Sequence, residues 1–172
     1  HNVANALFAA VAAGLAGTDV DSVRQGLRSA PAIPHRMEPV GERDGVLWIN
    51  DSKATNVAAA ASALRSLDRQ AVVLLGGKDK GEDLSPLARA LVGRARVAIL
   101  YGASRERFEA ELRGSVPLRV VSGAFEDAVA EGAGEAKPGE ALLLSPACSS
   151  FDMFTDYTAR GERFRELAGK GG

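Results

Sequence analysis

The first part of the chain carries apolar residues at helical spacing. The larger ones lie three or four positions apart, on one face of a helix: Val3, Leu7, Phe8, Val11 and Leu15. Asp19 or Asp21 can cap a second, shorter helix that runs through Leu27. Residues 29–34 contain two prolines, which interrupt helix and sheet alike, so we expect a hinge or domain boundary at residues 29–36.

Beyond this boundary, short apolar runs alternate with helical segments. Residues 37–40 and 46–50 flank a turn-like stretch at 41–45 and predict an antiparallel hairpin. Four more runs are typical of strands buried on both faces: 71–75, 97–101, 118–121 and 141–144. Helices are expected between and after them at roughly 56–66, 84–92, 104–113, 124–135 and 154–168. The alternation predicts an α/β fold with a doubly wound, mostly parallel six-stranded sheet and an antiparallel edge hairpin, preceded by two helices.

Composition excludes several classes of protein. Net charge is −1 over 172 residues with both signs mixed, so we expect no nucleic-acid or anionic-lipid partner. The single cysteine, Cys148, excludes an internal disulfide and a thiolate metal cluster, which suits a reducing cytoplasm. The sequence predicts no membrane insertion. A first residue of His1, without a methionine, indicates a piece of a longer protein.

The segment after the second predicted strand combines a carboxylate, an ammonium and a hydroxyl. In an open α/β sheet, ligands bind beyond the carboxyl ends of the strands. Asp51, Lys53 and Thr55 alternate there, which in an extended segment directs all three to one side. Lys53 can neutralise a phosphate, and Asp51 can hold a ribose hydroxyl or orient Lys53. Alternatively, Thr55 caps the next helix and the other two form a surface pair.

Two more strand ends carry candidate chemistry. Residues 76–83 begin with two glycines, which let a backbone approach a ligand closely, and Lys80 can then meet a carboxylate. This segment matches neither the P-loop nor the dinucleotide pattern, and a flexible loop with solvated charges is the alternative. Residues 145–152 are rich in small hydroxyl side chains and are expected to open a helix that favours anions, although Ser149 or Ser150 can be a simple N-cap.

Residues of the presumed hinge also include a His-Arg pair. His35 and Arg36 can stack on a base or reach a phosphate from a second domain, and a solvated linker is the alternative. The sequence argues against a serine hydrolase, because there is no G-x-S-x-G motif and His35 is the one internal histidine.

Five blocks, in this order, resemble the Mur ligase family: HNVAN at 1–5, PHR at 34–36, NDSKATN at 50–56, LGGKDKG at 75–81 and LSPACSSFD at 144–152. The last two are similar to the D-glutamate-adding members, and the Asp-Asn-Pro-Arg type of motif of the diaminopimelate- and lysine-adding members is absent. The resemblance runs from His1 to about Leu167.

The resemblance implies a Rossmann-like carboxy-terminal ligase domain at 34–172, preceded at 1–33 by two helices of a central ATPase domain. In such enzymes ATP, with magnesium, phosphorylates the carboxylate of UDP-N-acetylmuramoyl-L-alanine, and the amine of D-glutamate attacks the acyl phosphate. The P-loop, the magnesium ligands and a modified lysine lie upstream in this family. We therefore expect no metal ligands in this fragment and no activity from the fragment alone.

The resemblance also implies roles for individual residues. Those that serve the nucleotide are Asn2, Asn5, His35, Arg36, Asp51 and Lys53, with Lys53 and Asp51 in catalysis. Those that hold D-glutamate are Thr55, Lys80, Ser150, Phe151 and Tyr157. Asn2, Asn5 and Tyr157 rest on the resemblance alone. Two other functions stay open, a stand-alone nucleotide- or anion-binding module and a fragment of a folate polyglutamylating ligase.

Overall fold

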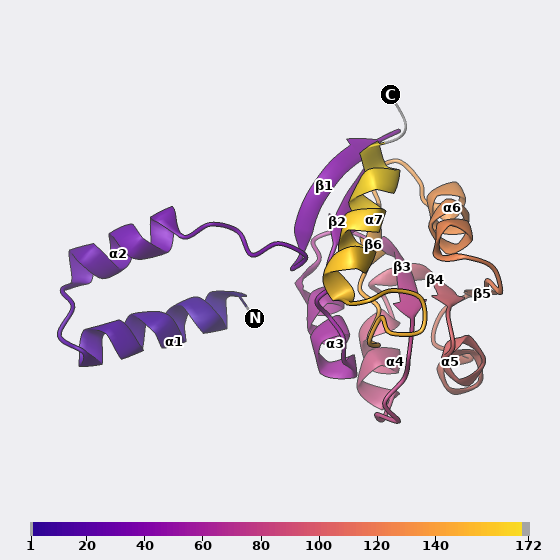
Figure 1. Cartoon of the computed structure of the whole chain (residues 1–172), viewed down its shortest axis with the longest axis horizontal. Helices are drawn as coiled ribbons and strands as arrows, with labels where there is room; N and C mark the ends of the chain where they lie inside the picture. The colour runs from indigo at the N-terminus through magenta and orange to yellow at the C-terminus, as the bar shows by residue number, and fades with distance from the viewer. Residues whose placement is uncertain (1, 170–172) are drawn as a thin grey trace. The chain divides into compact units, whose positions relative to one another are not determined.

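The computed structural model describes residues 2–169, and the chain divides into two compact units between Ile33 and Pro34. The first unit consists of α1 (Asn2–Leu15) and α2 (Val20–Ser29). The second contains, in chain order, β1 (Glu38–Arg43), β2 (Val46–Asn50), α3 (Val57–Ser66), β3 (Ala71–Gly76), α4 (Ser85–Leu91), β4 (Ala95–Tyr101), α5 (Arg105–Leu112), β5 (Leu118–Val120), α6 (Phe125–Glu135), β6 (Ala141–Leu144) and α7 (Tyr157–Gly169) (Figure 1).

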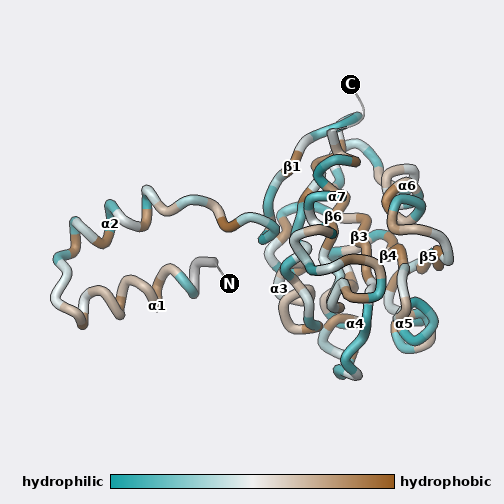
Figure 2. The backbone as a smooth tube through the Cα atoms, viewed as in Figure 1, coloured by the Kyte–Doolittle hydropathy of each residue, from teal (hydrophilic) through white to brown (hydrophobic). Residues whose placement is uncertain are grey.

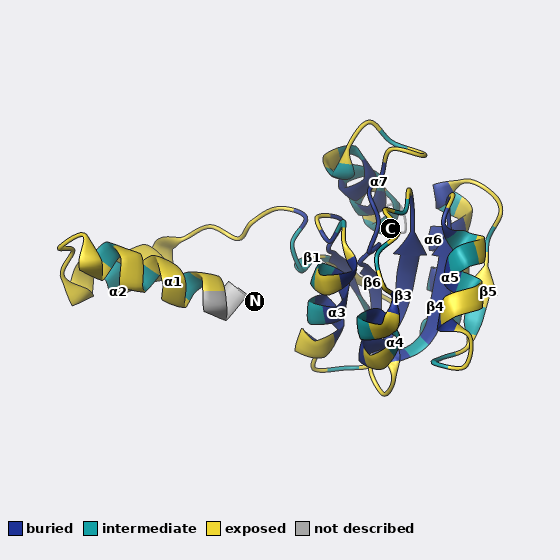
Figure 3. Ribbon diagram, turned by 90° about the horizontal axis from the view of Figure 1, so that it is seen from below, coloured by how far each residue is buried: buried dark blue, intermediate teal, exposed yellow. Residues whose placement is uncertain are grey.

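The helical unit leaves its apolar residues exposed. Asp19 caps α2, because its carboxylate accepts hydrogen bonds from the backbone N–H groups of Asp21 and Ser22. On α1, Phe8 and Leu15 are 76% and 86% exposed, and both helices are largely exposed in Figure 3. Packing between α1 and α2 therefore does not bury the apolar face that the sequence pattern predicts.

The α/β unit is built on a six-stranded sheet with the order β1-β2-β6-β3-β4-β5. The pair β1–β2 is antiparallel and the other four pairs are parallel, so the predicted fold class is confirmed. Asn50 of β2 and Leu74 of β3 both pair with Leu144 of β6. The carboxyl ends of these three strands therefore lie at one level, on the same edge of the sheet.

Helices cover both faces of this sheet. Alternate residues of β3 face opposite sides: Val73 packs in one apolar cluster with α3, α4 and α5, and Leu74 in the other with α6 and α7. β3 and β6 are buried throughout and β4 is buried except at Arg96, as Figure 3 shows, and these strands include strongly apolar segments of the chain in Figure 2. Complete burial of each leucine contributes about 1.5–3 kcal/mol, which explains why these strands read as unbroken apolar runs.

The edge hairpin differs from its prediction. The turn is not the five residues 41–45, because β1 continues to Arg43 and the chain reverses at Asp44 and Gly45. Both have positive φ values, 53° and 74°, as a two-residue hairpin turn requires. Met37 lies outside the strand with a φ of 46°, and the pairing register shifts between Pro39 and Gly41, where proline offers no donor.

Candidate functional site

The three candidate loops gather at the edge where β2, β6 and β3 end. The helix that follows β3, α4, packs on one face of the sheet, and α7, which follows β6, packs on the other. Neighbouring strands whose connections leave in opposite directions open a crevice between their carboxyl ends, and this is the usual ligand site of a doubly wound sheet. The loops after β3 and β6 lie at this position and contact each other.

The glycine-rich loop is fastened to the loop after β6. Lys78 donates its backbone N–H to the carbonyl oxygen of Ser149 at 2.9 Å, and the Ser149 hydroxyl donates to the Lys78 carbonyl at 2.9 Å. Gly77 has a φ of 131°, and a Cβ there would lie 2.3 Å from the Ser149 carbonyl oxygen. Glycine at 77 therefore serves the contact between two loops, whereas the sequence pattern suggested close approach to a ligand.

A buried arginine connects the loops after β2 and β6. Arg160 of α7 donates from Nε to the Ser52 hydroxyl at 2.9 Å, and from Nη2 to the carbonyl oxygens of Ser52 and Cys148 at 3.0 and 3.1 Å. Its side chain is fully buried, and among the described residues its Nη1 has no hydrogen-bond partner. Sequence reasoning missed Arg160. The available signal was its position four residues before the core residue Phe164, on the same helical face.

Asp51 faces the interior of the protein. It is 3% exposed, and its carboxylate accepts hydrogen bonds from the Ser145 hydroxyl at 2.8 Å and the Met37 N–H at 3.1 Å. Burial raises its pKa to about 6, although these two bonds and the charge of Arg36 act in the opposite direction. The segment is a turn closed by an Ala54 N–H to Asp51 carbonyl bond, so the predictions of a one-sided extended segment and of a surface pair are both wrong.

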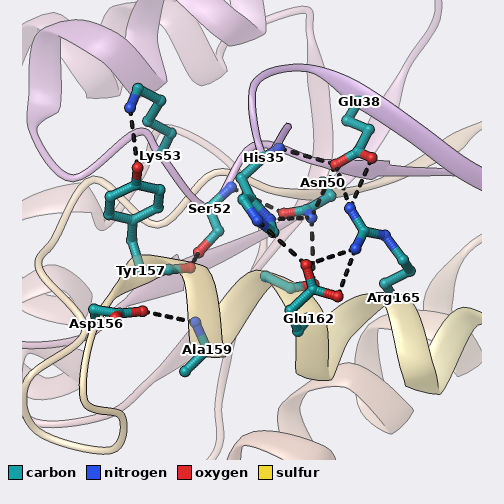
Figure 4. A network of polar contacts seen from close by, with 11 residues as sticks. His35, Glu38, Asn50, Ser52, Lys53, Asp156, Tyr157, Ala159, Glu162 and Arg165 are labelled. Carbon is teal, nitrogen blue, oxygen red and sulfur yellow. Dashed lines mark hydrogen bonds and ion pairs between the residues drawn. The ribbon is translucent and has the colours of Figure 1, made fainter. Parts of the chain in front are cut away.

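Lys53 points outward and meets Tyr157. Its Nζ donates to the Tyr157 hydroxyl at 3.1 Å and lies 4.7 Å from the centre of the ring (Figure 4). The hydrogen bond from Lys53 lowers the pKa of the Tyr157 phenol. Two residues 104 positions apart, each a predicted site residue, are therefore in contact at the same sheet edge.

Thr55 and Lys80 also lie together. Lys80 donates from Nζ to the Thr55 carbonyl oxygen at 3.4 Å, and both side chains have access to solvent. The cap of α3 is Asn56, whose side chain accepts the Ala59 N–H at 2.8 Å, so the alternative that Thr55 caps this helix is wrong. Nearby in the sequence, the Glu82 carboxylate accepts a hydrogen bond from the backbone N–H of Val57 at 3.2 Å, which connects the glycine-rich loop to α3.

The loop after β6 does not open a helix directly. Ser150 is 2% exposed, and its carbonyl oxygen accepts the N–H groups of Met153 and Phe154, while α7 begins only at Tyr157. Asp156 supplies the first-turn acceptor of α7, to the N–H of Ala159 at 2.8 Å. The prediction that residues 145–152 open a helix is therefore wrong, and so is the alternative that Ser149 or Ser150 is its N-cap. Phe151 projects outward and is 67% exposed.

The remaining site candidates are divided between the two units. His35 is buried, 5% exposed, so the alternative of a solvated linker is wrong for this residue, and Arg36 beside it is half-buried. Asn5 is exposed on α1, in the helical unit, and the side chain of Asn2 lies outside the described part of the structure.

Within residues 2–169, no group of three or more His, Cys, Asp or Glu side chains is arranged to hold a metal ion. No helix of that part of the chain is long and apolar enough to cross a membrane.

Comparison with known proteins identifies the family of this chain. Residues 35–148 match the model of the Mur ligase, glutamate ligase domain. The chain belongs to this Mur ligase family. A Mur ligase relative from Salinibacter ruber, named UDP-N-acetylmuramoylalanine–D-glutamate ligase, is 44% identical over 97% of the chain. A protein of the same name from Acidobacterium capsulatum is 42% identical over 97%. The chain spans 36% of the length of each of these curated relatives.

Solved structures share the Mur ligase fold at lower identity. The UDP-N-acetylmuramate-alanine ligase of Thermotoga maritima superposes with a TM-score of 0.69 at 18% identity, over 100% of this chain and 38% of that one. A bifunctional folylpolyglutamate synthase/dihydrofolate synthase of Yersinia pestis gives 0.56 at 21%, over 88% and 33%. A domain of a putative ligase of Haemophilus ducreyi gives 0.51 at 16%, over 77% of this chain and 100% of that one.

Proposed function

We propose that this chain is the carboxy-terminal part of an ATP-dependent ligase that adds D-glutamate to UDP-N-acetylmuramoyl-L-alanine in peptidoglycan synthesis, in the cytoplasm. The observation that carries the proposal is that three loops follow strand ends at one edge of the sheet, with Lys53 and Lys80 exposed to solvent, in a chain 44% identical to a ligase of that name. The longer enzyme then supplies the P-loop, the magnesium ligands and the modified lysine, and the chain alone is inactive.

The nucleotide is assigned to the amino-terminal side of this arrangement. Arg36 is the half-buried cation whose charge acts on the buried carboxylate of Asp51, and Lys53, two residues after Asp51, is an exposed cation. A pair of fixed cations stabilises the negative charge that moves between the transferring phosphate and its acceptor. Asp51 is assigned a supporting role beside Arg36, because the charge of Arg36 lowers the pKa of its carboxyl group. Asn2 and Asn5 are assigned to the adenine end, on the resemblance alone.

D-Glutamate is assigned to the neighbouring group of residues. Its two carboxylates need cationic or hydroxyl donors, since burying an unpaired carboxylate costs several kcal/mol. Lys80 lies against Thr55 in the structure, and Tyr157 lies against Lys53, and both lysine contacts involve the segment that follows β2. Ser150 and Phe151 form the wall contributed by the loop after β6.

These assignments give different residues to the two steps of the reaction. ATP phosphorylates the muramoyl-alanine carboxylate, and the D-glutamate amine then attacks the acyl carbon through a tetrahedral intermediate and displaces phosphate. In that sequence Lys53 and Arg36 bind phosphate oxygens, and Lys80 orients the amino acid whose amine attacks. The chain's own contribution is therefore to bind and orient the reacting groups.

Steady-state kinetics of the full-length ligase tests the proposal. Lys80→Ala is expected to raise the KM for D-glutamate more than the KM for ATP, because it removes a carboxylate partner. Lys53→Ala is expected to abolish turnover, because it removes charge stabilisation at the phosphate. The exposed Lys137, at the opposite end of β6, is the matched control, and its alanine variant is expected to behave as wild type. Unchanged D-glutamate kinetics in Lys80→Ala, or near-normal kcat in Lys53→Ala, refutes the corresponding assignment.

A substrate comparison separates the proposal from its relatives. The Yersinia pestis folylpolyglutamate synthase shares the fold at 21% identity, a level that supports the fold alone. The full-length protein is expected to use D-glutamate and to reject L-glutamate with a folate acceptor. The reverse preference excludes the peptidoglycan reaction and leaves the family assignment intact.

A further inference from the structure

The exposed linker between the two units ends at His35, which is buried. Residues 30–34 are exposed, whereas His35 is buried and adopts a left-handed backbone conformation with a φ of 60°. Its N–H donates to Oε2 of Glu38 at 2.9 Å, and its carbonyl oxygen accepts the N–H of Lys53 at 3.0 Å. The linker therefore ends at a residue that is fixed on both sides of its backbone.

The hydrogen bonds of Asn50 define the state of the imidazole. Asn50 accepts the Ser52 N–H through Oδ1 at 3.1 Å, so its Nδ2 is the atom that lies 2.9 Å from Nδ1 of His35 (Figure 4). Because Nδ2 is a donor, Nδ1 must accept, and the proton of the neutral ring is on Nε2. That nitrogen lies 3.4 Å from Oε1 of Glu162. Both ring nitrogens are thus engaged within the domain.

The ring occupies a space that a glycine on α7 provides. A Cβ at Gly161 would lie 2.2 Å from Nδ1 of His35 and 3.1 Å from Nδ2 of Asn50. Asn50 also donates to the Gly161 carbonyl oxygen at 3.3 Å. A side chain at position 161 would therefore expel the imidazole or push α7 away from β2.

Charged side chains close the network around this ring. Arg165 of α7 bonds both carboxylate oxygens of Glu38 at 2.8 and 3.0 Å and also pairs with Glu162 (Figure 4). Partial burial favours a raised pKa for Glu38, but the His35 N–H and Arg165 outweigh it and the pKa is lowered. The start of β1, the end of β2 and α7 are therefore joined through His35.

We infer that His35 is a positioning residue, whose buried imidazole anchors the linker to α7 and thereby fixes the places of Arg36 and Lys53 at the phosphate site. Arg36 follows it directly, Lys53 is hydrogen-bonded to its carbonyl oxygen, and the next residue, Met37, donates to Asp51. On this view His35 serves the nucleotide without touching it, and any rotation between the two units takes place before His35. The inference rests on the function proposed above.

The tautomer can be tested on this chain by NMR. It has two histidines, so a long-range ¹H–¹⁵N spectrum contains two imidazoles, and His1→Gln assigns them. His35 is expected as a single Nε2–H tautomer. Gly161→Ala is expected to displace the ring and restore averaging between tautomers, while Gly134→Ala, on α6 with no atom near its added methyl group, leaves the spectrum unchanged. An averaging His35 in the wild-type chain overturns the inference.

Kinetics of the full-length ligase separates positioning from contact. His35→Ala is expected to lower kcat about 100-fold, the effect of a displacement near 1 Å, with little change in the KM for ATP. His35→Asn keeps an acceptor for Asn50 and tolerates the left-handed backbone, so it is expected to recover much of kcat. Gly161→Ala, which removes no polar group, is expected to reproduce the kinetic pattern of His35→Ala.

Two outcomes oppose the inference without affecting the proposed function. If His35→Ala raises the KM for ATP and His35→Asn gives no recovery, the ring contacts the nucleotide. If kcat is unchanged in His35→Ala while Lys53→Ala is inactive, the phosphate site stands and the anchoring role does not. Failure of the Lys53 and Lys80 variants to affect catalysis refutes the proposed function itself.

Discussion

Replacing Arg160 with methionine tests how the loops at the sheet edge are held. The guanidinium donates three hydrogen bonds to two loops from a fully buried position. Methionine has similar length and no donor, so the variant leaves the carbonyl oxygens of Ser52 and Cys148 without this partner. Each buried unsatisfied acceptor costs about 1–3 kcal/mol. In the opposite direction, the variant releases the cost of burying a guanidinium whose Nη1 is unpaired.

The balance of these effects gives the expected size. Two unsatisfied carbonyls cost about 2–6 kcal/mol, and relief of the buried charge is expected to offset part of this. A net destabilisation of about 2–4 kcal/mol is expected, which is a large share of the 5–15 kcal/mol typical of a domain. Urea unfolding, followed by circular dichroism, measures this destabilisation. The loss in free energy of unfolding is obtained from the shift in the urea midpoint, provided that the m-value is unchanged.

Arg163 provides the matched control on the same helix. It is partly exposed and pairs with Glu126 and Glu166, so Arg163→Met is expected to cost at most about 1 kcal/mol. If Arg160→Met is as stable as the wild type, the guanidinium does not hold the loops together. Buried hydrogen bonds to Ser52 and Cys148 would then contribute nothing net, and the reasoning about this site would be refuted.

Three further predictions follow from the geometry. Asp51→Asn removes a group whose pKa is about 6 in the fold against 3.8 when exposed. Wild-type stability is expected to fall by about 2.4 kcal/mol from pH 4 to pH 7, because the unfolded state releases this proton first. The variant lacks this fall, and parallel pH–stability curves for the two proteins contradict the reasoning. Gly77→Ala places a Cβ 2.3 Å from a carbonyl oxygen and is expected to lower the free energy of unfolding, measured in urea, by more than about 2 kcal/mol. Gly81→Ala, in the same loop but with open space around the added Cβ, is expected to lower it by about 1 kcal/mol. Equal losses in the two variants contradict the loop contact. Removal of residues 1–33 is expected to leave cooperative unfolding intact, because both apolar clusters lie wholly in the second unit, and a non-cooperative product contradicts it.

The order of secondary-structure elements was predictable because the central strands are buried on both faces. Runs such as 71–75 are apolar at every position, because neither face of the strand is exposed. The helices between them repeat their apolar residues every three or four positions, so each element was identified within a few residues. The edge hairpin was harder. Its β1 strand is mostly exposed, and apolar spacing carries no information about a strand that buries little.

The side-chain directions at the site were less predictable than its location. Asp51 and Lys53 belong to a turn, so alternation along an extended chain did not apply, and one faces inward while the other faces solvent. His35 lies next to two prolines, and nothing local indicates that α7, more than a hundred residues later, supplies its pocket. Arginine is usually a surface residue, and only the position of Arg160 on the core-facing side of α7 indicates that it is buried.

These errors share a physical origin in α7. This helix reaches the end of β2 through Arg160 and Gly161, and reaches the start of β1 through Arg165. Each of these contacts joins residues more than a hundred positions apart, so no local pattern encodes them. The loops carry the groups that we propose to meet a ligand, and α7 determines how those loops face one another. A substitution on the buried side of α7 should therefore alter the proposed phosphate and amino-acid positions together, whereas a substitution within one loop should alter only its own.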